Sequence, residues 1–234
     1  MLKNLSLYLL LVMLCGCVPE VEKKGIDAVA KYYGGQVNYK IGMGASTNAE
    51  ELQGRYVELE LVNDKLGTQF SKLSIPASNC AYLFYTNLTE AEKQNYSYVK
   101  IAIKGKNNLY TQAYTLKQLA IVELAKDKFD EVGSLIAYKR YDELLARVND
   151  ADIAPSALDN LKTAFINADE KYGQTKAFQL QGFEFFEHKA RGEMQQMLSM
   201  FGTLQKERIS GGISLSVDPA VSITKRYIVG IHLN

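Results

Sequence analysis

The chain has 234 residues, of which 47% are hydrophobic and 23% charged, with 17 glycines and 4 prolines. This is the composition of a folded globular protein, so collagen-like, disulfide-scaffold and disordered classes are excluded. Twenty-seven basic and 26 acidic residues give a net charge of +1, which lacks the positive excess that nucleic-acid binding requires. We therefore expect no nucleic-acid partner.

Residues 1–16 have the pattern of a signal peptide. Lys3 supplies one positive charge, an apolar run follows from Leu5 to Leu14, and small residues come next. The apolar run covers about 10 residues, whereas a helix needs roughly 20 to cross a bilayer. A permanent transmembrane span is therefore the weaker interpretation, and the segment predicts export.

The end of this segment, Leu14-Cys15-Gly16-Cys17, resembles the bacterial lipobox, in which a branched apolar residue at −3 and a small residue at −1 precede a cysteine. The resemblance implies cleavage between Gly16 and Cys17 and a diacylglycerol thioether on Cys17. Two or three acyl chains, at about 0.8 kcal/mol per buried CH₂, anchor a domain at the membrane surface. The alternative is an ordinary secretory signal that is cut nearby.

Residues 17–24 are short and mixed in charge, and we expect them to form an unfolded tether. Val18 differs from the aspartate that is associated with inner-membrane retention in enteric bacteria, which favours the outer membrane. Cys80 is the only other cysteine of the processed chain, and its apolar neighbours predict a buried free thiol.

Residues 25–115 have the pattern of an N-terminal α+β domain. Alternating apolar and polar residues predict a half-buried antiparallel sheet with one face in water, which helices cover on its apolar side. The expected elements are a helix at 25–33 that Gly34 and Gly35 end, strands at 37–43 and 57–61, a helix at 75–85, a capping box at Thr89, and strands at 99–103 and 109–115.

Residues 116–234 predict a second α+β domain, which a long helix with Thr115 as its N-cap joins to the first. The fold class is therefore α+β, with two small halves that each place helices on an antiparallel sheet. The further elements are a helix at 141–148, a helix at 156–173, strands around a bulge at Gly182, a Met-rich helix or loop at 193–204, and strands at 213–217 and 227–233.

The order of elements from residue 126 to 234, with the turn from Tyr172 to Phe178, resembles the cone-shaped nuclear-transport-factor-like (cystatin-like) domains. The resemblance implies a pocket between helices and sheet, and enzymes of this fold carry an acid/base residue inside the cone. No residue here can be matched to that position. The whole chain is similar to uncharacterised lipoproteins of Gram-negative bacteria, which implies an envelope location and no particular reaction.

The sequence contains few residues that could form a catalytic or metal-binding site. His188 and His232 are the only histidines, and we interpret both as solvated residues, His232 on the outer face of the last strand. Two histidines and no cysteine cluster predict no metal site, and no cofactor is expected. Glu58 and Glu60 lie on one face of a strand, about 7 Å apart, and we interpret them as surface acids rather than a glycosidase pair.

Three further patterns have mainly structural interpretations. We read Gly42-Met43-Gly44 as a turn rather than a dinucleotide loop, because no parallel unit follows it. The Met-rich segment is expected in the core, with a ligand lid or a partner groove as alternatives; it contains Met194, Met197, Leu198, Met200 and Phe201. Several tyrosines lie near one another in the sequence, namely Tyr82, Tyr85, Tyr96 and Tyr98. We interpret most of them as packed in the fold with a hydrogen-bonded hydroxyl, and a recognition surface is the alternative.

Together these patterns predict a non-catalytic lipoprotein that is anchored through Cys17, faces the periplasm or the cell exterior, and binds another envelope component. The alternative is a protein of a different class, a small-ligand binder or an enzyme. It would use the cone of the C-terminal half, because such domains tend to have pockets. An inhibitor or immunity protein is a third possibility.

Overall fold

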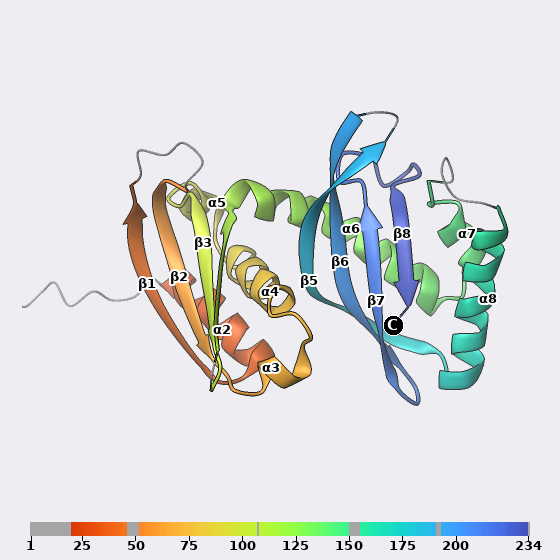
Figure 1. The fold of residues 1–234 in the computed structure, drawn as a ribbon, viewed down its shortest axis with the longest axis horizontal. Coiled ribbons are helices and arrows are strands. Elements are labelled where there is room, and N and C mark those ends of the chain that lie inside the picture. Colours follow the sequence, from red (N-terminus) through yellow and green to blue (C-terminus); the bar gives the residue numbers. More distant parts are fainter. Residues whose placement is uncertain (1–19, 46–51, 107, 150–154, 191–192, 234) are drawn as a thin grey trace, which may run out of the picture.

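The computed structural model describes residues 20–45, 52–106, 108–149, 155–190 and 193–233. Two four-stranded sheets lie side by side with helices packed on them, in the strand orders β1-β2-β3-β4 and β5-β6-β7-β8 (Figure 1). The predicted α+β class is confirmed. Helix α6 (Leu116–Ala137) begins directly after the first sheet and passes behind the second.

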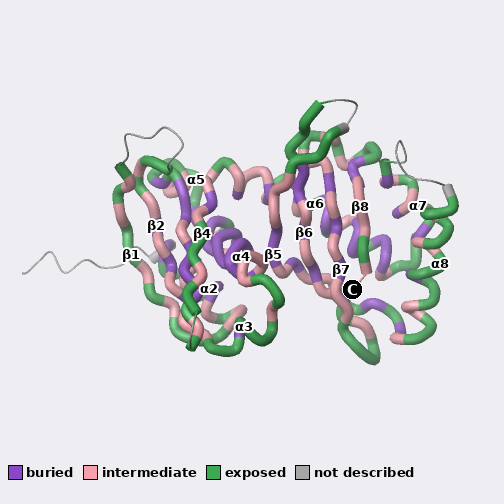
Figure 2. Tube along the Cα trace, viewed as in Figure 1, coloured by how far each residue is buried: buried purple, intermediate pink, exposed green. Residues whose placement is uncertain are grey.

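The first sheet and its helices are formed by residues 20–115. One face of the sheet is buried under α2 and α4, because Val57, Leu59 and Leu61 point toward them, and the other face is open (Figure 2). Its elements are α2 (Glu20–Tyr33), β1 (Gln36–Gly44), β2 (Gly54–Val62), α3 (Leu66–Gln69), α4 (Ser74–Tyr85), α5 (Glu90–Lys93), β3 (Tyr98–Lys104) and β4 (Leu109–Thr115).

This sheet is mixed, so the expectation of an antiparallel sheet is wrong for its central pair. Strands β2 and β3 run parallel, while β1 pairs with β2 and β3 with β4 in antiparallel register. Parallel neighbours need a long crossover, which α3, α4 and α5 provide between Val62 and Tyr98. Alternation of apolar residues shows which face of a strand is buried, and it carries no information on strand direction.

The prediction of an unfolded tether at residues 17–24 is wrong from Glu20 onward, because α2 begins there. The side chain of Glu22 is only 4% exposed, and its carboxylate accepts a hydrogen bond from the hydroxyl of Tyr96. This contact links the helix to a residue 74 positions later. Tertiary packing thus extends the helix into a segment that has no apolar periodicity of its own. Residues 17–19 lie outside the described part.

The second sheet is antiparallel throughout. The predicted bulge is confirmed, because the register of β5 against β6 shifts between Leu180 and Gly182. The elements of this half, after α6, are α7 (Tyr141–Leu145), α8 (Pro155–Tyr172), β5 (Thr175–Ala190), β6 (Glu193–Lys206), β7 (Ser210–Val217) and β8 (Ile228–Leu233).

The Met-rich segment forms strand β6, so its interpretation as a helix or loop is wrong. Leu198, Met200 and Leu204 are buried, and Gly202 between them is buried too, which is the period of two that a strand shows. Apolar residues on the other face, such as Phe201, add helix-like spacings that obscure this period. The expected core position is confirmed for Met197 and Met200, whereas Met194 is 60% exposed.

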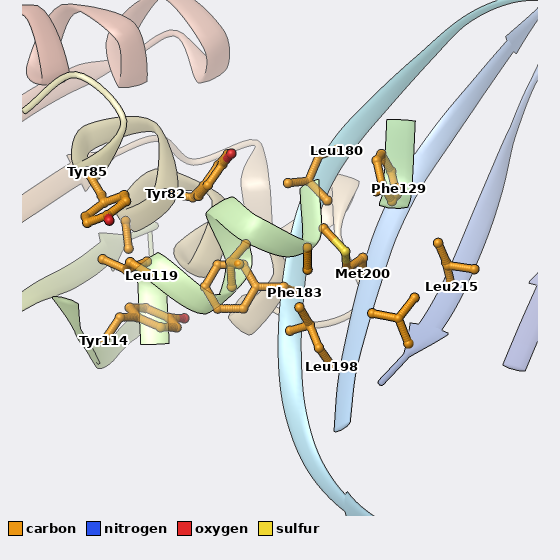
Figure 3. Packing of buried hydrophobic residues seen from close by; sticks show 14 of the residues in the cluster. Tyr82, Tyr85, Tyr114, Leu119, Phe129, Leu180, Phe183, Leu198, Met200 and Leu215 are labelled. Atoms are coloured by element: carbon orange, nitrogen blue, oxygen red, sulfur yellow. The ribbon is translucent and has the colours of Figure 1, made fainter. Parts of the chain in front are cut away.

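The hydrophobic core continues from one sheet to the other (Figure 3). The ring of Phe183 in β5 packs edge-on against Tyr114 in β4, with ring centroids 5.6 Å apart. Its backbone N–H donates to Ser78 Oγ of α4 over 2.8 Å. A Cβ at Gly182 would lie 2.1 Å from the carbonyl oxygen of Ile75, so only glycine permits α4 to lie this close to β5.

Candidate functional site

A cleft lies between α8 and the edge of the second sheet. A cavity of about 480 Å³ opens there beside β8, and a smaller one of about 200 Å³ opens near the start of β7. The larger cavity is lined mostly by apolar side chains, namely Val148, Ala157, Leu158, Leu161, Ile228, Val229 and Ile231, together with Asn160, Gly230 and His232. We call the two cavities together the α8 cleft.

The α8 cleft exists because α8 is held to the rest of the fold at few points. Phe165 is the helix's one fully buried residue among those described, and its ring stacks on Tyr141 at 5.5 Å. In sequence it lies between Leu161, which lines the larger cavity, and Ala168, which lines the smaller one. Leu158 and Leu161 are only partly buried. The helix therefore has an apolar stripe that the sheet does not fully cover.

A buried polar cluster fixes the C-terminal half of α8. Lys206 Nζ of β6 lies 2.5 Å from Asp169 Oδ1, and the hydroxyl of Tyr141 donates to Asp169 Oδ2 over 2.5 Å. Burial, and then the hydrogen bond to Asp169, raise the pKa of the Tyr141 hydroxyl. Lys206 also lines the smaller cavity. The cluster therefore places one member of a buried ion pair in the wall of a mostly apolar cavity.

Apolar walls with a few polar groups at the rim are typical of sites that bind an apolar ligand, and the larger cavity is within the usual size range of roughly 300 to 1,000 Å³. His232 lies at the rim of this cavity and is exposed, as predicted. His188 is exposed near the end of β5. Because β5 and β8 are opposite edges of the sheet, about 14 Å separate the two strands, and the histidines form no pair.

Glu58 and Glu60 lie on the open face of the first sheet, where each has a cross-strand partner. Glu58 is bridged by Lys40 at 3.1 Å and Lys100 at 3.2 Å, and Glu60 accepts a hydrogen bond from Asn38. Burial raises the pKa of the Glu58 carboxyl, but the hydrogen bonds from the two lysines outweigh it and hold the pKa below its usual range. A general acid needs a raised pKa, so these contacts favour the interpretation as surface acids.

Gly42, Met43 and Gly44 end strand β1, so their interpretation as a turn is wrong. A Cβ at Gly42 would lie 2.4 Å from the ring of Tyr56, which stacks on Tyr98 at 4.9 Å. The glycines leave room for two aromatic rings on the open face. Their function in the fold is to accommodate this stack rather than to reverse the chain.

The tyrosines that the sequence analysis named are packed inside the fold and do not form an exposed recognition surface. Tyr82 and Tyr85 are buried in α4, and the hydroxyl of Tyr85 donates to Glu123 over 3.0 Å. Tyr96 is buried against Glu22, and Tyr98 belongs to the ring stack. The structural interpretation of this group is therefore confirmed.

Cys80 is a buried free thiol, as predicted, and burial raises its pKa. Gly16 and Cys17, the predicted cleavage and lipid-attachment residues, lie outside the described residues. Within the described ranges, no three His, Cys, Asp or Glu side chains are grouped to hold a metal ion. No helix of that part is long and apolar enough to cross a membrane.

The chain matches no family model, no curated protein and no solved structure. The resemblance of the C-terminal half to cone-shaped domains implied a pocket between helices and sheet, but the sequence did not single out the residues that line the α8 cleft. The apolar stripe of α8, with Leu158, Leu161, Phe165, Ala168 and Tyr172, was visible as a helix face. Whether a stripe is fully covered depends on the distance between the helix and its sheet, which periodicity does not encode.

Proposed function

We propose that this protein is a membrane-anchored envelope lipoprotein that acts without catalysis, by binding another envelope component whose apolar part enters the α8 cleft. Anchoring is supported by the lipobox-like residues that end in Cys17. Binding is supported by one observation, the larger cavity of about 480 Å³ with its apolar lining beside β8. The outer membrane is the proposed location.

Removal of apolar surface from water supplies the binding free energy in such a cleft, at roughly 25 cal/mol per Å². The side chains of Leu158 and Leu161 on α8 face Ile231 of β8 across the larger cavity. An acyl chain, or the apolar side chains of a protein partner, matches this chemistry. The exposed His232 and Asn160 at the rim would remain in contact with water.

Two measurements on membrane-extracted protein test the proposal. Mass spectrometry of the wild type and of the Cys17→Ser variant tests the anchor, and we expect an acylated N-terminal Cys17 peptide only in the wild type. Fluorescence titration with a dansyl-labelled fatty acid tests the cleft. Leu161→Glu places a charge in the cavity wall and is expected to weaken probe binding at least tenfold, whereas Leu124→Glu, at a side chain that is 75% exposed, is not.

An unmodified, freely soluble chain would contradict the anchor. Equal probe binding by the Leu161→Glu and Leu124→Glu variants would contradict the cleft as the binding site. Cross-linking in intact cells from a photoreactive residue at Asn160 would then separate a lipid ligand from a protein partner, because only a protein partner gives a second set of peptides.

The alternative, a small-ligand binder or enzyme in the C-terminal half, uses the same cleft. His232 is the histidine among the residues that line the larger cavity, and histidine is the side chain that most often acts as a general acid or base, so it is the residue to test. Turnover of a bound ligand that is abolished by His232→Gln, with ligand binding retained, would favour this alternative over the non-catalytic role.

A further inference from the structure

The first turns of α2 lie at one corner of the first sheet. Glu22 is bonded to Tyr96, and the guanidinium of Arg55 lies 5.2 Å from the centroid of the Tyr96 ring. Arg55 is the direct cross-strand partner of Met43 in β1. These four residues form a series of neighbouring side chains that connects the start of α2 with the end of β1.

Apolar side chains are exposed at this same corner. Ile41 is 40% exposed and Met43 is 70% exposed. Ile41 and Met43 are on the side of the sheet that α2 and α4 cover elsewhere, since Ile41 pairs with the buried Val57. We call Ile41 and Met43 the apolar corner.

Basic side chains lie on the two elements that neighbour the apolar corner, α2 and β2. Lys23 and Lys24 in the first turns of α2 are exposed, and so is Arg55. Exposed apolar side chains together with Lys and Arg are the combination that binds a phospholipid surface, because the apolar groups enter the interface and the cations contact the phosphates. Each Lys or Arg near an anionic surface contributes about 1 kcal/mol.

The length of chain before α2 indicates what covers this corner. Glu20 follows Cys17 by three residues, and three fully extended residues span at most about 11 Å. An acylated Cys17 therefore holds the start of α2 within about 11 Å of its point of attachment. Because the apolar corner lies at the start of α2, it is brought to the bilayer as well.

We propose that the apolar corner rests on the phospholipid bilayer, with Ile41 and Met43 in the interface and with Lys23, Lys24 and Arg55 at the phosphates. This rests on the proposed acylation of Cys17. Helix α8 lies at the opposite end of the long axis of the molecule from β1 (Figure 1). The bilayer contact therefore turns the α8 cleft away from the membrane that carries the anchor.

Site-specific labelling tests the orientation on the acylated full chain. Cys80 is buried and Cys17 is blocked by the lipid, so an introduced cysteine is the only accessible thiol among the described residues and the anchor. Met43→Cys places a fluorophore in the apolar corner. Ile209→Cys, at a side chain that is 56% exposed beside the smaller cavity, places the same fluorophore at the α8 end. Both sites are exposed, so neither change should unfold the protein.

The labelled proteins are reconstituted in vesicles of phosphatidylethanolamine and phosphatidylglycerol that contain spin-labelled lipid. We expect at least twofold quenching of the label at residue 43 and no quenching of the label at residue 209. Equal quenching at the two sites, with an acylated Cys17 in the mass spectrum of the same sample, overturns the orientation and leaves the proposed anchor standing. An unacylated Cys17 overturns both.

Discussion

Asp169 of α8 and Lys206 of β6 form an ion pair of 2.5 Å in which the side chains are only 6% and 5% exposed. The carboxylate also accepts a hydrogen bond from the hydroxyl of Tyr141, and Lys139 Nζ lies 3.9 Å from it. A charge that is buried this far is tolerated only with its partner, because removal of one partner leaves the other desolvated and unpaired. The ion pair therefore fixes how α8 sits over the sheet, and with it the shape of the α8 cleft.

The first prediction follows from this pairing. Asp169→Asn is expected to lower the free energy of unfolding by about 3 to 5 kcal/mol, because Lys206 keeps its charge in a buried site. The double change Asp169→Asn with Lys206→Met should recover most of that loss. Urea denaturation at pH 7 measures both. If the double variant is as unstable as Asp169→Asn alone, the unpaired charge of Lys206 is not the cause of the lost stability.

Phe165 is one of the residues through which α8 packs against α7. Phe165→Ala removes a fully buried ring that stacks on Tyr141, and we expect it to cost about 3 to 5 kcal/mol of unfolding free energy. Ile166→Ala, at a neighbouring side chain that is 38% exposed, is the matched control and should cost much less. If both variants unfold at the same urea concentration, Phe165 does not hold the helix.

Acid is expected to weaken the first sheet through Glu58. The pKa of this carboxyl is lower in the folded protein than in the unfolded chain, so its stabilisation is present above the unfolded pKa of about 4.3 and is lost as the pH falls through the folded pKa. Glu58→Gln should therefore be less stable than the wild type at pH 6, and the difference should shrink toward pH 3.

Urea denaturation across this pH range measures the effect of Glu58. Glu187→Gln, at an exposed carboxylate near the end of β5, serves as the control and should follow the wild type. A difference between Glu58→Gln and the wild type that stays constant from pH 6 to pH 3 would contradict the assignment.

Gly182 of β5 lies directly against the backbone of α4. A methyl group at this position would lie 2.1 Å from the backbone oxygen of Ile75, so Gly182→Ala should push α4 away from β5 and cost about 1 to 3 kcal/mol. Gly230→Ala in β8 is the matched control, because a methyl group at Gly230 would lie 3.6 Å from the nearest atom, Cβ of Ser216, which is an ordinary van der Waals contact. Thermal unfolding of the two variants should separate them, and equal midpoints would contradict the packing argument.

Local signals in the sequence predicted most elements of the fold. Thr89 and Thr115 form the capping boxes that begin α5 and α6, and these depend only on residues within one turn. The bulge at Gly182 was predicted for the same reason, since a change of phase along one strand is visible in that strand alone.

The features that depend on distant residues were not predictable. The parallel pairing of β2 with β3 is decided by where the crossover helices bring the chain back, and the helical start of α2 is decided by the contact of Glu22 with Tyr96. The α8 cleft likewise depends on how closely one helix approaches a sheet, which Phe165 and Asp169 determine together. Lipid attachment at Cys17, in contrast, is predicted from adjacent residues alone, and mass spectrometry is the measurement that tests it.

Helix α2 is bonded near both of its ends to segments that are far away in the sequence. Near its start Glu22 holds Tyr96, and at its end the hydroxyls of Tyr32 and Tyr33 donate to the carbonyl oxygens of Leu180 and Gln181 in β5. A pulling force applied to the chain ahead of Glu20 is therefore transmitted along the helix axis to both sheets at once. The two halves share such a load, so the molecule resists tension as one body instead of unravelling from its N-terminal end.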